Sequence, residues 1–286
     1  MPYSWLDLVK QITGELVVKV SPLSEGCVGQ VYGLKFQNRP TLVAKVATET
    51  NLETLETEGR TLIYLEENST IPVPKVVHNS EGLLLLEFIK SDLYMTVEVQ
   101  RDCARHFLAL HECSSDGYGF EFDTVIGGIY QPNSWSSNWL DFYAEQRIQY
   151  MAKIAREKGN LSSSECLRIE KLCYRLDKWL LEPEQPSLLH GDAWSGNILC
   201  KEGRLRAVID PACYYGHPEV ELAFTTMFNT FNEEFFDEYE RSMPLREGFF
   251  EERRDLYLIY PILVHIALFG GSYNNDLARK LSRYNC

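Results

Sequence analysis

The most informative segment of this chain is residues 188–200, with the sequence LLHGDAWSGNILC. Four residues separate Asp192 from Asn197, and Asp210 follows thirteen residues after Asn197. A D-x-x-x-x-N spacing followed by a further Asp is typical of the catalytic loop of phosphotransferases. The apolar runs 198–200 and 205–209 flank the turn sequence KEGR, so they predict a hairpin that brings Asp210 back beside Asn197.

These three polar residues match the needs of phosphoryl transfer. A γ-phosphoryl group passes through a loose, charge-dispersed transition state, so the protein mainly positions the reactants and neutralises charge. We assign Asp192 as the base that orients an acceptor hydroxyl and takes its proton. Asn197 and Asp210 offer the oxygen ligands that Mg²⁺ prefers. A single Asp is most often a surface acid, so this assignment depends on the combined spacing and the predicted hairpin.

A β-rich segment precedes this loop and contains a candidate phosphate-binding lysine. Lys45, in the sequence LVAKV, resembles the strand lysine of the V-A-I-K motif, which contacts the α- and β-phosphates of ATP. Of Glu53, Glu56 and Glu58 in the helix predicted over 52–66, we assign Glu58 as its carboxylate partner. Strands are predicted at 16–20, 28–36, 41–47, 75–78 and 82–89.

Two backbone segments of this β-rich part are further candidates for nucleotide contacts. The run 24–33, SEGCVGQVYG, contains Gly26 and Cys27, and small residues there let N–H groups approach phosphate. It lacks a full G-x-G-x-x-G-x-V pattern, and a plain hairpin turn would look similar. The run 83–89, LLLLEFI, has the form of a strand that enters a hinge, where the backbone at Glu87, Phe88 and Ile89 would contact adenine.

The hydrophobic periodicity changes near residue 89. The later segments repeat their apolar residues every 3.6 positions, as amphipathic helices do. The chain is therefore predicted to be a bilobal α+β protein. Residues 1–89 form a small nucleotide-binding lobe of sheet plus helix, and residues 90–286 form a larger, mostly helical lobe for catalysis and substrate binding. A cleft between two such lobes is the expected ligand site.

The net charge and the cysteine pattern limit the classes of partner and the location that we expect. The 286 residues carry a formal net charge of −13, which repels phosphate backbones and anionic lipid surfaces. We therefore expect neither nucleic acid nor a membrane as a partner. The eight cysteines form no C-x-x-C pair, and the start of the sequence lacks the pattern of a secretory signal. These features favour reduced thiols and a cytoplasmic location.

Longer segments that include the catalytic-loop motif resemble the sequences of one enzyme family. Residues 190–197, HGDAWSGN, resemble the H-G-D-L-W-S-G-N of fructosamine (ketosamine) kinases, and residues 209–223, IDPACYYGHPEVELA, resemble that family's D-P-A-x-Y-Y-G-x-x-E-x-D-L-A. WLDFYAEQR at 139–147 and LFGGSY at 268–273 add to the match. The resemblance covers nearly the whole chain. It implies a protein-kinase-like fold within the wider superfamily of aminoglycoside and choline kinases.

The resemblance also implies an activity. Fructosamine kinases use ATP to phosphorylate the 3-hydroxyl of a ketose attached to an amine, which labilises the adduct. The implied partner is a small-molecule or protein-linked ketosamine, and the implied role is deglycation. Two alternatives stay open: a superfamily kinase for an aminoglycoside, choline or methylthioribose, and a nucleotide-binding pseudokinase. Retention of Lys45, Asp192, Asn197 and Asp210 argues against the pseudokinase.

Candidate substrate contacts follow from the residues around the motif. Trp194 lies beside the predicted base and would stack on a sugar face, although a core-packing role is equally common for Trp. Tyr214 or Tyr215 would hydrogen-bond sugar hydroxyls, and Glu219 would receive the cationic amine. Cys27 is a redox candidate, because a thiol near backbone N–H donors favours the thiolate. The chain is accordingly expected to be a monomer or a dimer linked by a disulfide.

Overall fold

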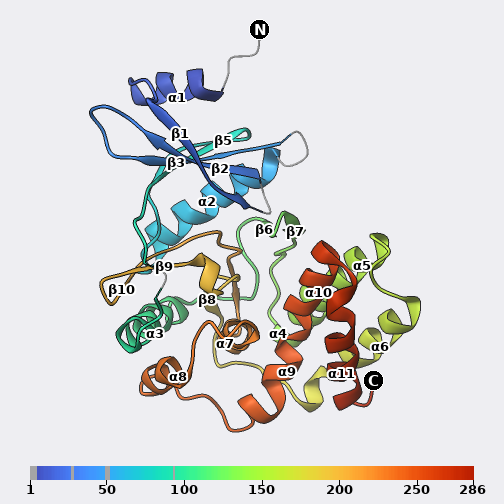
Figure 1. The fold of residues 1–286 in the computed structure, drawn as a ribbon. Helices are drawn as coiled ribbons and strands as arrows, with labels where there is room; N and C mark the ends of the chain where they lie inside the picture. The colour runs from blue at the N-terminus through green and yellow to red at the C-terminus, as the bar shows by residue number, and fades with distance from the viewer. Residues whose placement is uncertain (1–4, 27–28, 49–51, 93) are drawn as a thin grey trace.

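A computed structural model describes residues 5–26, 29–48, 52–92 and 94–286. A five-stranded antiparallel sheet with two helices lies at the N-terminal end, and the remaining chain forms a larger, mainly helical part (Figure 1). The sheet order is β1-β2-β3-β5-β4. Its elements are α1 (Trp5–Thr13), β1 (Lys19–Gly26), β2 (Gly29–Lys35), β3 (Leu42–Val46), α2 (Leu52–Asn68), β4 (Val76–Ser80) and β5 (Leu83–Glu87).

Both faces of this sheet are covered, which explains the unbroken run of leucines in β5. Successive side chains of a strand point to opposite faces. Leu83 and Leu85 pack in the cluster under α1, whereas Leu84 and Leu86 pack with Leu62 of α2. Figure 1 shows the two helices on opposite sides of the sheet. A strand buried on both faces is continuously apolar, because no position of it meets water.

The first strand differs from its prediction. It spans Lys19–Gly26 instead of 16–20, because its limits follow from pairing with β2, from Lys19 opposite Lys35 to Gly26 opposite Gly29. Leu16 and Val18 remain 66% and 61% exposed, so that apolar run is not buried in a sheet. The run predicted as a phosphate-binding loop therefore lies mostly in the ends of β1 and β2.

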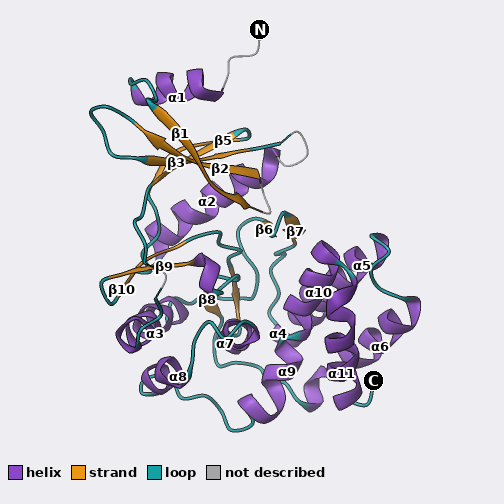
Figure 2. Cartoon of the chain, viewed as in Figure 1, coloured by secondary structure: helices purple, strands orange, loops and turns teal. Residues whose placement is uncertain are grey.

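The larger part consists mainly of helices joined by loops and short strands (Figure 2). Its buried apolar side chains form one hydrophobic core. Trp139, Tyr143 and Arg147 are fully buried there, and Arg147 donates to the carbonyl of Pro132 and to Asn133 Oδ1. Its elements are α3 (Val97–His111), β6 (Thr124–Ile126), β7 (Ile129–Gln131), α4 (Trp139–Phe142), a π-helical segment (Tyr143–Gln149), α5 (Tyr150–Glu157), α6 (Ser163–Cys173), β8 (Ser187–Leu189), β9 (Ile198–Lys201), β10 (Arg204–Val208), β11 (Tyr214–Gly216), α7 (Pro218–Met227), α8 (Glu233–Glu240), a second π-helical segment (Phe249–Arg253), α9 (Arg254–Tyr257), α10 (Ile259–Phe269) and α11 (Asn274–Arg283).

Helix α2 belongs to the small part in sequence but also contacts the large part. The hydroxyls of Tyr64 and Tyr215 lie 3.0 Å apart, and the Arg60 guanidinium lies 4.0 Å from the ring centroid of Phe122. These contacts fix the helix that carries Glu58 against the large lobe. The division between residues 89 and 90 stays a prediction, with the chain passing between the two parts after β5 ends at Glu87. Within the described ranges, no helix has both the length and the apolarity to cross a bilayer.

Candidate active site

The predicted hairpin is confirmed and places two of the predicted site residues together. Strands β9 and β10 pair in antiparallel register from Ile198 opposite Val208 to Lys201 opposite Arg204. Beyond the hairpin, the N–H of Ile209 donates to the carbonyl of Asn197 at 3.0 Å. Asp210 therefore follows directly from a residue that is hydrogen-bonded to Asn197.

The loop before the hairpin turns sharply at Gly191. Its φ is +85°, and a Cβ there would lie 2.1 Å from the carbonyl oxygen of Ala212, so only glycine fits. The turn leads into Asp192, which accepts a hydrogen bond from Asn197 Nδ2 at 2.9 Å on Oδ2. The same Nδ2 donates to the backbone carbonyl of Asp192, also at 2.9 Å. Asn197 thus fixes the direction of the Asp192 carboxylate.

The surroundings of Asp192 favour a group that can take a proton. Burial first, and the nearby Asp210 carboxylate second, raise the pKa of Asp192 to about 7, while the hydrogen bond from Asn197 opposes the shift. A catalytic base is most effective when its pKa lies near the working pH. The position and the electrostatics of Asp192 both suit the role that its spacing predicts.

Lys45 joins the sheet to the end of the hairpin. Its Nζ lies 2.7 Å from Glu58 Oε1 and 2.5 Å from Asp210 Oδ1. Burial by itself would lower the pKa of Lys45, but the two carboxylates outweigh it and raise that pKa above the ordinary value. Lys45 is therefore a fixed cation, and Glu58 is the helix carboxylate that faces it.

The donor set at Asn197 and Asp210 fits a magnesium ion that is held mainly by phosphate and water. Because Nδ2 of Asn197 is used toward Asp192, its Oδ1 is the group left for a cation. The Asp210 side chain is 43% exposed, so it is accessible. Mg²⁺ takes one or two protein oxygens plus substrate phosphates at such sites. Among the described residues, no group of three or more His, Cys, Asp or Glu side chains could hold a metal ion.

Asp210 also has an unusual backbone conformation. Its φ is +56°, a left-handed conformation that costs a non-glycine residue about 1–3 kcal/mol. Residues held in this region concentrate at functional sites, where the surrounding structure maintains them. The conformation of Asp210 agrees with the functional role predicted for it.

The predicted nucleotide contacts are only partly described. Gly26 ends β1 opposite Gly29, and Cys27 lies outside the described residues. At the predicted hinge, the N–H of Glu87 donates to the carbonyl of Lys75 at 2.9 Å, so it is not free for adenine. Phe88 is 39% exposed and Ile89 is half-buried just after β5. The adenine contact at these residues stays a prediction.

A network of hydrogen bonds around Glu221 holds the backbone of the catalytic loop, and the sequence analysis missed it. The buried carboxylate of Glu221 accepts from the N–H of Gly191 at 2.6 Å and from that of His190 at 3.2 Å. His111 of α3 contacts the same carboxylate through Nε2 at 2.9 Å, and its Nδ1 lies 2.7 Å from the Tyr239 hydroxyl. The position of His111 directly after Leu110, on the apolar stripe of its helix, could have marked it as buried and in need of a partner.

A pocket of about 240 Å³ lies beside Asp192. Trp194, which is predicted to stack on a sugar, forms part of its wall. The tip of its ring lies so close to Gly196 that a Cβ there would be 2.4 Å away. His265 of α10 is a second wall residue, which the sequence analysis missed. The described residues that line the pocket are Ile126, Gly127, Asp192, Trp194, Phe224, Phe228, Pro261, Val264, His265, Leu268, Phe269 and Tyr273.

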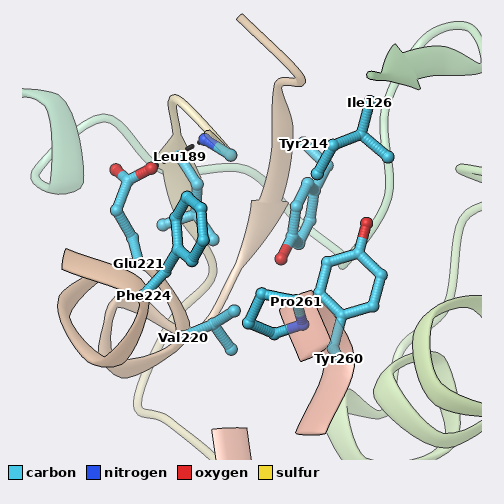
Figure 3. Close-up of a pocket in the computed structure, with 9 residues that line it drawn as sticks. Ile126, Leu189, Tyr214, Val220, Glu221, Phe224, Tyr260 and Pro261 are labelled. Carbon is cyan, nitrogen blue, oxygen red and sulfur yellow. Dashed lines mark hydrogen bonds between the residues drawn. The ribbon is translucent and has the colours of Figure 1, made fainter. Parts of the chain in front are cut away.

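The other three predicted substrate residues lie elsewhere. Tyr214 is buried with its ring 3.9 Å from the Arg147 guanidinium, and it faces a small enclosed cavity together with Tyr260 and Pro261 (Figure 3). The Tyr215 hydroxyl is paired with Tyr64. Glu219 is 3% exposed and forms two hydrogen bonds of 2.7 Å with Arg253. None of the three lines the pocket beside Asp192, because each is engaged in the protein interior.

Comparison with known proteins shows the family of this chain. The family model described as fructosamine kinase matches residues 4–285. The chain belongs to the fructosamine kinase family. It is 34% identical over 281 residues to a probable ketoamine kinase of Vibrio parahaemolyticus, a match that covers 94% of this chain and 95% of the Vibrio protein.

Solved structures with similar folds include the following two. A crystal structure assigned as a fructosamine-3-kinase from Thermobifida fusca superposes with a TM-score of 0.86 and 29% identity, covering 98% of this chain and 99% of that one. An aminoglycoside phosphotransferase in complex with AMP-PNP and hygromycin B has a TM-score of 0.67 and 18% identity, covering 98% and 96%. The predicted family and the kinase-like α+β fold are confirmed.

Proposed function

We propose that this protein is an ATP-dependent ketosamine 3-kinase. The observation that carries the proposal is the convergence of Asp192, Asn197, Asp210 and Lys45 beside a pocket of about 240 Å³. Membership of the fructosamine kinase family supports the choice of a ketosamine as acceptor. Phosphorylation at the 3-position would labilise the sugar adduct, so the proposed role is deglycation of free or protein-linked amines.

The proposed mechanism is direct transfer from ATP to the sugar hydroxyl. Asp192, fixed by Asn197, orients the hydroxyl and takes its proton as the hydroxyl oxygen bonds to the γ-phosphorus. The bond from that phosphorus to the β,γ-bridging oxygen breaks, and ADP leaves with the electron pair. Lys45, paired with Glu58, contacts the phosphates of ATP. Mg²⁺ held by Asn197 and Asp210 would neutralise the charge of the phosphates.

One panel of acceptors tests the proposal. ATP consumption is measured with fructosyl-, ribulosyl- and erythrulosyl-amines, aminoglycosides and choline, and NMR identifies the phosphorylated position. We expect turnover with ketosamines and a phosphate on the 3-hydroxyl. Turnover with aminoglycosides or choline alone would replace this proposal by another kinase of the superfamily. ATP binding without transfer to any acceptor would indicate a pseudokinase.

A further inference from the structure

The pocket beside Asp192 has little negative charge for a site that receives an amine. Of the described residues that line it, only Asp192 has a carboxylate, and we assign that group to the reacting hydroxyl. The other walls are apolar or aromatic, apart from the imidazole of His265 and the phenol of Tyr273. Glu219, which the sequence suggested for the amine, is paired with Arg253 in the interior. Another group must therefore meet the cation.

His265 has a defined hydrogen-bonding state. Its Nδ1 lies 2.7 Å from the carbonyl oxygen of Pro261, and a carbonyl only accepts, so Nδ1 carries the proton. Burial lowers the pKa of His265, which favours the neutral ring. Nε2 then has a lone pair, and none of the described residues hydrogen-bonds to it. The half-buried ring thus offers one hydrogen-bond acceptor in a wall of the pocket.

Aromatic rings surround this imidazole. Its centroid lies 4.9 Å from that of Tyr273, 5.3 Å from that of Phe228 and 5.7 Å from that of Phe269. Phe228 also lies 6.0 Å from the ring of Trp194, so aromatic rings extend from the residue beside the base to His265. Ring faces attract ammonium ions, and more strongly where water is excluded.

In the proposed substrate, the amine lies close to the hydroxyl that reacts. In a ketosamine, the nitrogen is separated from the 3-hydroxyl oxygen by only three carbon atoms, so a sugar held at Asp192 places its ammonium within the same pocket. A secondary ammonium has two N–H donors and needs an acceptor. We propose that His265 binds the substrate ammonium by accepting a hydrogen bond at Nε2, with the rings of Phe228 and Tyr273 against the cation. This inference rests on the proposed function.

The proposal also specifies a substrate class. A pocket with one imidazole acceptor and aromatic walls suits an acceptor with a single cation and an apolar substituent on its nitrogen. It is unfavourable for acceptors with several ammonium groups, because each further charge would be desolvated without a partner. Among ketosamines, the protein is therefore expected to prefer monocationic adducts of apolar amines.

The test compares two acceptors in three variants. The acceptors are the fructosyl adduct of benzylamine and 1-deoxyfructose, which keeps the 3-hydroxyl but has no amine. His265→Phe keeps a ring among its aromatic neighbours and removes the acceptor atom. His265→Gln retains a polar group near the position of Nε2. His106→Phe is the matched control, since His106 is a half-buried histidine of α3 outside the pocket.

We expect His265→Phe to reduce kcat/KM for the fructosyl amine by ~10-fold or more, mainly through KM, because a hydrogen bond to a charged group is lost. The same variant should leave kcat/KM for 1-deoxyfructose and KM for ATP within about 2-fold, the range of a change without that hydrogen bond. His265→Gln should recover part of the loss, and His106→Phe should show none. Calorimetric titration of both acceptors gives the same comparison without turnover.

Each result supports or overturns the inference. Equal losses for the two acceptors in His265→Phe would show that the residue is only structural, and no loss for the amine would show that the ammonium binds elsewhere. Either result leaves the proposed function intact, provided that wild type phosphorylates the fructosyl amine. Failure of wild type to phosphorylate any ketosamine would instead refute the proposed function. Thermal melting of each variant verifies that it is folded.

Discussion

The Nζ atom of Lys45 lies 2.5 Å from Oδ1 of Asp210, although the two residues are 165 positions apart in the chain. The contact joins the third strand of the sheet to the end of the β9–β10 hairpin. Because Glu58 contacts the same Nζ, two carboxylates share one cation in a largely buried position. Lys45 is therefore needed both for the packing of α2 against the sheet and for the charge balance at Asp210.

Lys45→Met is expected to damage stability and catalysis by separate routes. Loss of the ammonium leaves the buried Glu58 without a partner, which costs about 3–5 kcal/mol of unfolding free energy. The additional change Glu58→Gln should restore most of the stability. It should not restore kcat, which we expect to stay ~10²-fold low or worse because a preorganised phosphate contact is gone. Chemical denaturation and steady-state assays of both variants measure the two effects.

Asp192→Asn is expected to abolish most turnover while ATP still binds. The amide keeps the shape of the side chain but cannot take the proton, and a positioned base contributes on the order of 10²–10⁴ in rate. The measurements are kcat at saturating Mg²⁺ and the Kd for ATP. A variant with near wild-type kcat would show that another group is the base.

Asp210→Ala and Glu221→Ala should fail in different ways. Asp210→Ala removes the carboxylate that we propose as a metal ligand, so turnover and metal-dependent ATP binding should fall together. Glu221→Ala instead removes the carboxylate that accepts from Gly191 and His111, so it should lower the melting temperature and kcat with little change in metal affinity. Titration of Mg²⁺ at fixed ATP separates the two. An unchanged Mg²⁺ requirement in Asp210→Ala would contradict its role as a ligand.

Glu219→Gln should change stability and leave acceptor KM within about 2-fold, the range of a substitution away from the bound substrate. The reason is its buried, two-fold contact with Arg253. Replacing the carboxylate weakens the hold on an otherwise uncompensated guanidinium, so the melting temperature should fall. A large rise in KM for ketosamines, with no fall in melting temperature, would place Glu219 at the substrate after all.

Oxidation of Cys27 stays a prediction from the sequence alone. The seven described cysteines are free thiols, and Cys103, Cys166, Cys200 and Cys213 are buried. Buried thiols react slowly with peroxide. Cys113, Cys173 and Cys286 are only partly buried, so the test has to separate them from Cys27. If Cys27 is the sensitive thiol, peroxide inactivates wild type reversibly, in part through an intermolecular disulfide, and spares Cys27→Ala. Activity assays, non-reducing gels and a reductant chase test this. Equal inactivation of both proteins would place the sensitive group elsewhere.

The parts of the site that the sequence predicted are those set by short-range spacing. Asp192, Asn197 and Asp210 lie within one loop and one hairpin, so their proximity follows from local strand and turn patterns. His265 and Glu221 were not assigned to the site, because their roles depend on packing between segments far apart in the chain. Glu221 lies 30 positions from Gly191 and 110 from His111. No local pattern specifies those contacts.

Where the structure differs from the sequence predictions, the cause is similar. Tyr214, Tyr215 and Glu219 lie next to the motif in sequence, but neighbouring residues of β11 and α7 point into the core instead of toward Asp192. The first strand was misplaced because the apolar pattern of 16–20 says nothing of the partner strand, and pairing with β2 sets the true limits. Side-chain direction and strand pairing both require the assembled fold.

The left-handed backbone of Asp210 places a conformational cost at the same position as a proposed metal ligand. Glycine would relieve a conformational cost of about 1–3 kcal/mol there, and asparagine would tolerate it better than most residues. That gain is opposed by a loss, because Asp210→Gly also removes a carboxylate that contacts the buried Lys45 ammonium. A screen of variants of this chain for heat resistance therefore also has to measure turnover, because one substitution at Asp210 changes both the backbone strain and the proposed metal site.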